Sequence, residues 1–149
     1  MKRVLSLLLP VTAVAVLLFP LMAQATSPGP VDSAGVQVEP QQQNGIRYLS
    51  GGIGEDEARS IQQAGGYNLH MTFAVGVDNK YIPDVDLVIS KAPGPSVFNL
   101  KQAGPLVYVQ LPPGKYSVQA TRNGVTRQDV TDVGSGNARN LVFHWDGDN

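Results

Sequence analysis

The sequence predicts a mainly β protein, a seven-stranded antiparallel Greek-key β-sandwich with one short N-terminal α-helix. Apolar and polar residues alternate along several segments after residue 66, which is typical of half-buried strands. The chain contains 16 Gly and 11 Pro, a density of chain-reversing residues that suits many short strands better than long helices. One segment has a helical pattern, and it precedes the alternating region.

Residues 1–25 are predicted to be a secretory signal peptide. Two basic residues precede an apolar run over residues 4–19, and Ala23 and Ala25 are small residues at the two positions that signal peptidase reads. We therefore expect cleavage between Ala25 and Thr26, no membrane insertion of the mature chain, and a periplasmic or secreted location. A retained signal anchor is the alternative, and two prolines in and after the apolar run weaken it as a continuous helix.

Composition narrows the classes of partner and chemistry. After loss of the two basic residues of the signal, nine Lys and Arg face twelve Asp and Glu, so the mature chain is weakly acidic. Such a surface offers nucleic acid little to bind. The chain has no Cys, which excludes disulfides, a lipid-modified cysteine and a Cys nucleophile. Stability must come from an ordinary apolar core.

The mature chain divides into four parts. Residues 26–45 are expected to be a flexible leader, because they combine three Pro, three Gly and three consecutive Gln with few large apolar residues. Residues 46–66 hold a short strand at Ile46–Leu49, a Gly-rich turn and the helix. Residues 67–145 form the sandwich, and residues 146–149 are a tail.

The helix is expected over about residues 55–64. Three carboxylates occupy its first turn, where they favour the positive end of the helix dipole, and two glycines follow its last apolar residue. Seven strands are expected after it, over residues 67–75, 85–89, 96–101, 106–111, 116–120, 125–133 and 141–145. Asn123-Gly124 between two of them predicts a type I′ hairpin.

The most distinctive motif is Leu111-Pro112-Pro113-Gly114, followed by Tyr116. The two prolines cannot sit inside a sheet ladder, because they lack backbone N–H donors. Gly114 is expected to permit a tight reversal, and a buried Tyr116 ring can return its hydroxyl to a nearby backbone group. The motif is therefore interpreted as structural.

Residues 111–118 resemble the Leu-Pro-Pro-Gly-x-Tyr-x-Val signature of the carboxypeptidase regulatory-like (transthyretin-like, prealbumin-type) β-sandwich domains. The preceding residues 104–109 and the segment 77–89 resemble the strand and opening hairpin of those domains. The resemblance implies a sandwich over about residues 69–145 that serves as an accessory module beside an active partner. The mature chain is also similar to small secreted proteins of Gram-negative bacteria, which implies a periplasmic home.

The residue types needed for catalysis or metal binding are scarce. His70 and His144 are the two imidazoles, and both are expected to point to solvent, since each lies between core-facing neighbours. On adjacent strands they would supply half of a metal site, which needs three or four ligands. Ser50 and Ser135 are flanked by glycines but do not stand in Gly-x-Ser-x-Gly. The 5-hydroxyisourate hydrolase of the transthyretin-like architecture needs more histidines and a Tyr-Arg-Gly-Ser terminus. The sequence therefore predicts no catalytic, cofactor-binding or metal-binding residue.

The Gly51–Gly54 stretch before the helix has two interpretations. A phosphate cradle would need a lysine that is missing here, and the three carboxylates that follow would repel an anion. A hinge is expected instead, about which the helix docks Ile61 on a sheet end or an open strand edge.

The function expected is that of a non-catalytic exported module that contacts an unidentified protein in the cell envelope. The alternative is a carbohydrate- or peptidoglycan-binding module that uses Tyr48, Tyr81, Tyr108 and Trp145. Burial is favoured for Tyr108 and Trp145, which continue apolar stripes. An enzyme of unrecognised type is a third, more distant option. Two or more coplanar, exposed aromatic rings on one face of the sandwich would favour the glycan-binding function.

Overall fold

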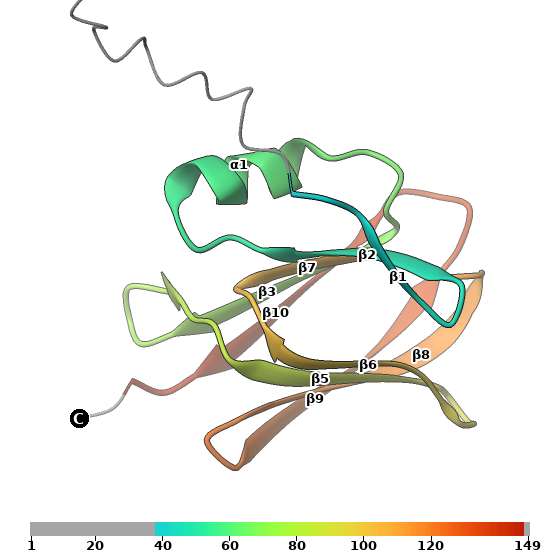
Figure 1. Cartoon of the computed structure of the whole chain (residues 1–149). Coiled ribbons are helices and arrows are strands. Elements are labelled where there is room, and N and C mark those ends of the chain that lie inside the picture. The colour runs from blue at the N-terminus through green and yellow to red at the C-terminus, as the bar shows by residue number, and fades with distance from the viewer. Residues whose placement is uncertain (1–37, 148–149) are drawn as a thin grey trace, which may run out of the picture. The chain divides into compact units, whose positions relative to one another are not determined.

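The computed structural model describes residues 38–147. The predicted signal peptide, its cleavage site at Ala25 and Thr26, most of the predicted leader and the end of the tail lie outside the described residues. Residues 38–147 form a β-sandwich of two sheets with one helix on an outer face (Figure 1).

The first sheet, sheet A, is mixed. Its strand order is β1 (Gln41–Gln43), β2 (Ile46–Gly51), β7 (Leu106–Gln110), β3 (Leu69–Val75) and β10 (Arg139–Trp145). The short β4 (Lys80–Tyr81) pairs with β3 at Ala74 and Val75, beyond the stretch that pairs with β7. Strands β3 and β10 run parallel over their whole length. The prediction of a purely antiparallel sandwich is therefore wrong for this pair.

The second sheet, sheet B, is antiparallel throughout. Its order is β6 (Ser96–Ala103), β5 (Val85–Lys91), β8 (Gly114–Arg122) and β9 (Val125–Val133). Between β8 and β9, Asn123 and Gly124 have φ angles of 48° and 76°, as the predicted type I′ turn requires. The main core fills the space between the sheets, and its largest fully buried side chains include Phe73 and Phe98.

All seven predicted strands are present, as β3 and β5–β10, but the count of seven is wrong. Ten strands form within residues 38–147, because β1 and β4 also pair and the short strand expected at Ile46–Leu49 is present as β2. Strand β1 lies in the segment predicted to be a flexible leader. Two of its glutamines are held by their side-chain amides: Gln41 Oε1 accepts from the Tyr48 hydroxyl at 2.8 Å, and Gln43 binds the backbone of Asn99. A count of apolar residues cannot detect this type of anchoring.

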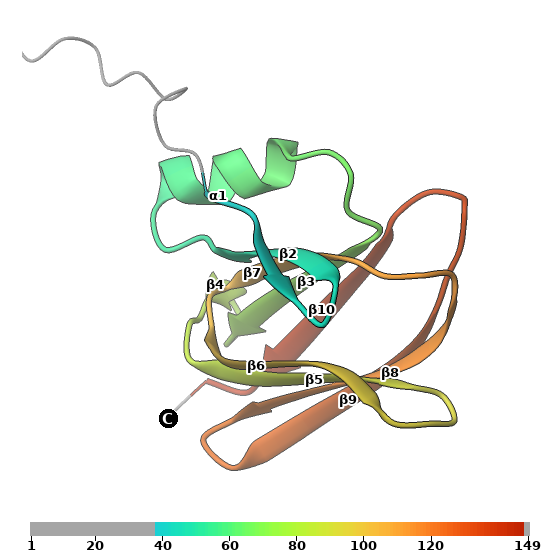
Figure 2. The same ribbon diagram turned by 45° about the vertical axis from the view of Figure 1, so that its right-hand side comes forward.

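The helix α1 (Glu55–Gln63) has nearly the predicted range, but it is not N-terminal, since it lies between β2 and β3. Its Ile61 is fully buried against Leu49, Leu106 and Tyr108 of sheet A. Burying such a side chain contributes about 1.5–3 kcal/mol. Both views show α1 over the outer face of sheet A, away from sheet B (Figures 1 and 2). The helix therefore covers a sheet face, and the prediction that it covers an end or edge is wrong.

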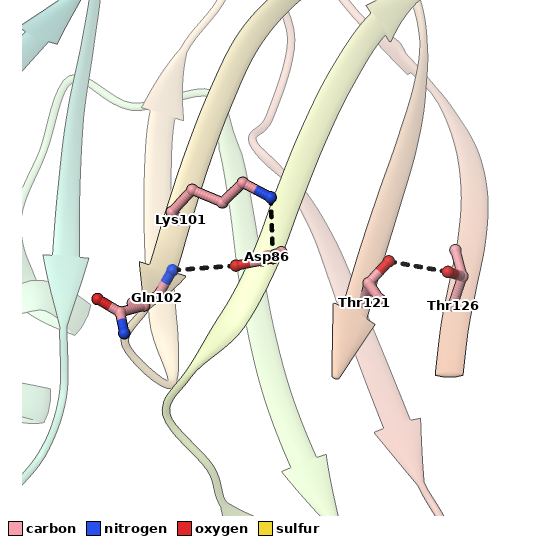
Figure 3. A network of polar contacts seen from close by, with 5 residues as sticks. All are labelled: Asp86, Lys101, Gln102, Thr121 and Thr126. Carbon is pink, nitrogen blue, oxygen red and sulfur yellow. Dashed lines mark hydrogen bonds and ion pairs between the residues drawn. The ribbon is translucent and has the colours of Figure 1, made fainter. Parts of the chain in front are cut away.

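The outer face of sheet B carries polar pairs (Figure 3). Asp86 accepts hydrogen bonds from Lys101 Nζ at 2.9 Å and from the Gln102 backbone N–H at 3.2 Å. These bonds, that of Lys101 first, lower the pKa of the Asp86 carboxyl below its usual value. The Thr121 and Thr126 hydroxyls form a cross-strand hydrogen bond at 2.8 Å. Within residues 38–147, no helix lies over this face.

Within residues 38–147, no helix has both the length and the apolar character needed to cross a membrane.

Candidate protein-contact site

The Leu-Pro-Pro-Gly motif connects β7 to β8. Leu111 is buried in the core, and the two prolines follow it between the strands. The Tyr116 hydroxyl donates to the backbone carbonyl of Pro112 at 2.6 Å, so the ring returns its hydroxyl to the backbone as expected. Burial raises the pKa of Tyr116 above its ordinary value. Each of these contacts is structural and internal to the domain.

Gly114 is the first residue of β8 and pairs with Val133, with a φ of 159°. The part that it plays in the reversal stays a prediction. A side chain from elsewhere in the chain holds the connection between the strands. The Asn68 amide donates to the Leu111 carbonyl at 2.7 Å and accepts from its N–H at 2.8 Å.

The two histidines lie on adjacent strands but do not meet. His70 is opposite Asn140 in the parallel ladder, whereas His144 is opposite Ala74. The four-residue offset separates the imidazoles by about 13 Å along the strands. His144 points to solvent as predicted, with Nε2 2.7 Å from the Gly76 carbonyl.

His70 lies between buried neighbours on β3, as expected, but it is only partly exposed to solvent. Its ring is half-buried and stacks on Tyr108, with centroids 3.7 Å apart and planes 5° from parallel. Its nitrogens lie 3.2 Å from the Tyr67 carbonyl and from Asn140 Oδ1. Within residues 38–147, no three His, Cys, Asp or Glu side chains gather as metal ligands would.

The four rings considered for glycan binding are not a platform. Tyr48, Tyr108 and Trp145 are buried, as the stripes of Tyr108 and Trp145 predict. Tyr81 on β4 is 42% exposed. Among these four rings one is therefore available to a ligand, and a pair of exposed coplanar rings is not formed.

A surface groove lies between α1, the Gly52–Gly54 loop and β4. It has a volume of about 530 Å³. Ala58, Arg59 and Gln62 of the helix line one side, and Lys80, Tyr81 and Pro83 line the other, with Pro105 and the loop between them. We call it the α1–β4 groove.

Two exposed apolar side chains border the α1–β4 groove. Ile53 is 66% exposed, between Gly52 and Gly54, whose φ angles of 102° and 105° suit glycine. This backbone takes the chain out of β2 and into α1 while it leaves Ile53 in solvent. Tyr81 also lines the groove, and its hydroxyl accepts a hydrogen bond from Gln62 Nε2 at 3.4 Å.

Two basic side chains line the groove, and they differ in whether they form an ion pair. Arg59 is paired with Glu55 at 2.8 Å, one turn apart on α1. Lys80 makes no ion pair within the part of the chain that the structure describes. The groove thus combines an apolar rim with one ammonium group that is available to an acidic partner.

The glycines before and beneath the helix differ in how tightly they pack. A Cβ atom at Gly104 would lie 2.7 Å from Gly51, so the two backbones are in close contact. A Cβ at Gly51 would also collide with the Glu57 carboxylate of α1. Gly51 is the last residue of β2 and serves close packing, so the hinge expected over Gly51–Gly54 stays a prediction for Gly52–Gly54.

Sequence reasoning named Tyr81 but missed Ile53, Lys80 and the two prolines of the groove. One signal was available: a large apolar residue inside a Gly-rich turn has no periodic partner and is a candidate for exposure. The prolines and Lys80 carried no such signal, because their meeting depends on how β4 folds back.

The sequence was also compared with known proteins. No protein-family model and no curated protein matches it.

Proposed function

We propose that the protein is a non-catalytic exported module that acts through protein–protein contacts in the periplasm or cell envelope, and that the α1–β4 groove is its contact surface. The observation that carries the proposal is that two exposed apolar side chains, Ile53 and Tyr81, line the same groove. Exposed apolar groups that border a hollow are typical of protein-contact sites.

The chemistry of the groove suggests the partner. An apolar side chain of the partner enters between Ile53 and Tyr81, and an acidic group beside it pairs with Lys80. The scaffold below is rigid, because Ile61 anchors α1 to sheet A. A rigid scaffold under exposed side chains loses little conformational entropy on binding.

The fold assignment belongs to the same proposal. The seven strands β3 and β5–β10 would be the Greek-key sandwich of the carboxypeptidase regulatory-like class, with β1, β2, β4 and α1 as additions to it. The contact between Tyr116 and Pro112 supports this assignment, since it makes the signature a structural turn. The predicted signal peptide supports the location.

The glycan-binding alternative has weaker support. Sugar rings stack on exposed aromatic faces, and Tyr81 alone of the four candidate rings offers one. It lies in the same groove, so a single experiment can separate the two functions.

The test places a photo-crosslinking amino acid at Ile53 and, as a matched control, at Val142. Both positions are 66% exposed, but Val142 lies on β10, away from the groove. Irradiation of cells that export each variant should give a discrete adduct from position 53 alone. Muramidase digestion should leave its mass unchanged, because the adduct is to a protein.

Equal adducts from both positions, or none from either, would contradict the proposal. An adduct from position 53 that muramidase shortens would instead establish the glycan-binding function.

A further inference from the structure

Strand β6 is an edge strand of sheet B, and a side chain occupies its outer edge. On one side β6 pairs with β5. On the other side, Gln43 Nε2 donates to the Asn99 carbonyl, and the Asn99 N–H donates to Gln43 Oε1, both at 2.7 Å. One amide thus makes the two hydrogen bonds that a residue of a neighbouring strand would make.

The cover of the β6 edge is small. Besides Gln43, the neighbouring Asn44 donates from Nδ2 to the Val97 carbonyl at 3.4 Å. Both residues belong to the β1–β2 hairpin, so the cover comes from one short element of sheet A. Lys101, further along β6, has its ammonium group on Asp86.

The opposite corner of the sandwich is closed more extensively. Trp145 Nε1 donates to the Val125 carbonyl at 3.0 Å, which joins β10 to the start of β9. Arg127 and Arg139 add side-chain bonds to the backbone carbonyls of His144 and Asp132, at 3.1 and 2.9 Å. These three long side chains span the whole corner, whereas the β6 edge depends on two amides.

We propose that the outer edge of β6 is a strand-pairing surface for β6 of a second copy of this chain, and that the Gln43 amide keeps it closed. An uncovered edge strand is a ready template for pairing. The backbone N–H and carbonyl of Asn99 point outward, since Gln43 binds them, so a two-fold antiparallel pair centred on Asn99 satisfies both groups.

The side chains of β6 are compatible with this two-fold pair. It places Val97 opposite Lys101 of the second copy, so no two like charges face each other. The β6 edge shares no residue with the α1–β4 groove, which lies between α1, the Gly52–Gly54 loop and β4. If strand pairing at β6 is not observed, the proposed function of the groove is therefore not affected.

The experiment replaces Gln43 by Ala, with Gln42→Ala as the matched control. Gln42 is the neighbouring, exposed glutamine of β1, and it makes no side-chain hydrogen bond within residues 38–147. Gln43→Ala should exchange the Asn99 amide hydrogen about tenfold faster in dilute solution. At high concentration it should sediment as a dimer, while Gln42→Ala and the unmodified chain remain monomers.

A cysteine reports the register. The chain has no Cys, so Asn99→Cys adds a single thiol. Residues directly opposite in such a pair have Cα atoms about 5.5 Å apart, within the range of a disulfide. Asn99→Cys combined with Gln43→Ala should form an intermolecular disulfide on mild oxidation, and Asn99→Cys alone should not.

A monomeric Gln43→Ala variant, or equal disulfide yields with and without Gln43, would overturn the proposal. If Gln43→Ala does not fold, as circular dichroism would show, Gln43→Glu takes its place. The carboxylate keeps the acceptor for the Asn99 N–H but removes the donor to its carbonyl, so the same dimer and the same disulfide are expected.

Discussion

Gly104, between β6 and β7, packs directly against the backbone of Gly51 on β2. A Cβ at Gly104 would lie 2.7 Å from Gly51, where backbone atoms leave no room for a side chain to move away. We expect Gly104→Ala to lower the free energy of unfolding by about 1–3 kcal/mol or more, as overpacking does. Urea denaturation measures it.

Gly134→Ala is the control for that substitution. A Cβ at Gly134 would meet no atom within 4 Å. Its urea midpoint should stay near that of the unmodified chain, and equal midpoints for the two variants would show that the contact between Gly51 and Gly104 is not tight.

Tyr116→Phe tests the turn between β7 and β8. The change removes the hydrogen bond to Pro112, so the free energy of unfolding at pH 7 should fall by about 1 kcal/mol. Burial raises the pKa of the folded Tyr116 phenol. Its contribution is therefore complete below the unfolded pKa of about 10 and is lost as the pH rises through the folded pKa.

The difference in free energy of unfolding between the unmodified chain and Tyr116→Phe should therefore become smaller above about pH 10. Urea midpoints measured from pH 7 to 11 give the profile. A difference that widens in alkali would mean that the phenolate is stabilised in the folded chain.

Two amide side chains show where residue-level prediction stops. Asn68 binds both backbone groups of Leu111, and Gln43 binds both of Asn99. Each acts across more than 40 residues of chain. The sequence marks Tyr116 through its proline turn, which is local, but an amide that replaces a distant strand has no local pattern.

At the scale of elements, α1 depends on its contact with sheet A. The helix has nine residues, and isolated helices of this length are marginal in water. Ile61→Ala removes its fully buried anchor, so we expect a loss of about 2–5 kcal/mol in the free energy of unfolding. Calorimetry measures the loss.

Ile53→Ala on the same segment is the control, since Ile53 is exposed and its removal should leave the melting temperature nearly unchanged. An unchanged melting temperature for Ile61→Ala would show that α1 does not stabilise the sheet.

The elements that the sequence predicted are those with a period or a turn signal of their own. The alternation from Leu69 to Val75 and the Asn123-Gly124 turn are local features, and both have their expected structure. Strand β4 has two residues, too few for a period. The parallel pairing of β10 with β3 depends on the path of the chain between them, which no single segment encodes.

At the scale of the whole molecule, export is the first condition of the proposed function. Ala23 and Ala25 precede the expected cleavage point, so the mature chain should begin at Thr26. N-terminal sequencing of the protein from a periplasmic fraction checks this. A chain that still begins at Met1 would contradict export with cleavage and favour the signal anchor.

The candidate site, like the fold, was predicted only where a local sequence pattern marks it. The sequence analysis named Tyr81 and the glycines beside Ile53. It did not predict that they line one groove, because they lie far apart in the chain. The groove forms because Gly52–Gly54 leads β2 into α1 on one side and β4 pairs with the end of β3 on the other. Neither event follows from the residues that line the site.

The central claim is that the α1–β4 groove is a protein-contact surface. Backbone hydrogen exchange, measured in the presence of the other periplasmic proteins, tests this claim most directly. Exchange is compared between the chain in a periplasmic extract and the purified chain. The account predicts at least about tenfold slower exchange in the extract at Ile53, Gly54 and Tyr81, with the Asn123-Gly124 turn unchanged. Equal exchange at the groove in both samples, or protection confined to the outer face of sheet B, would contradict it.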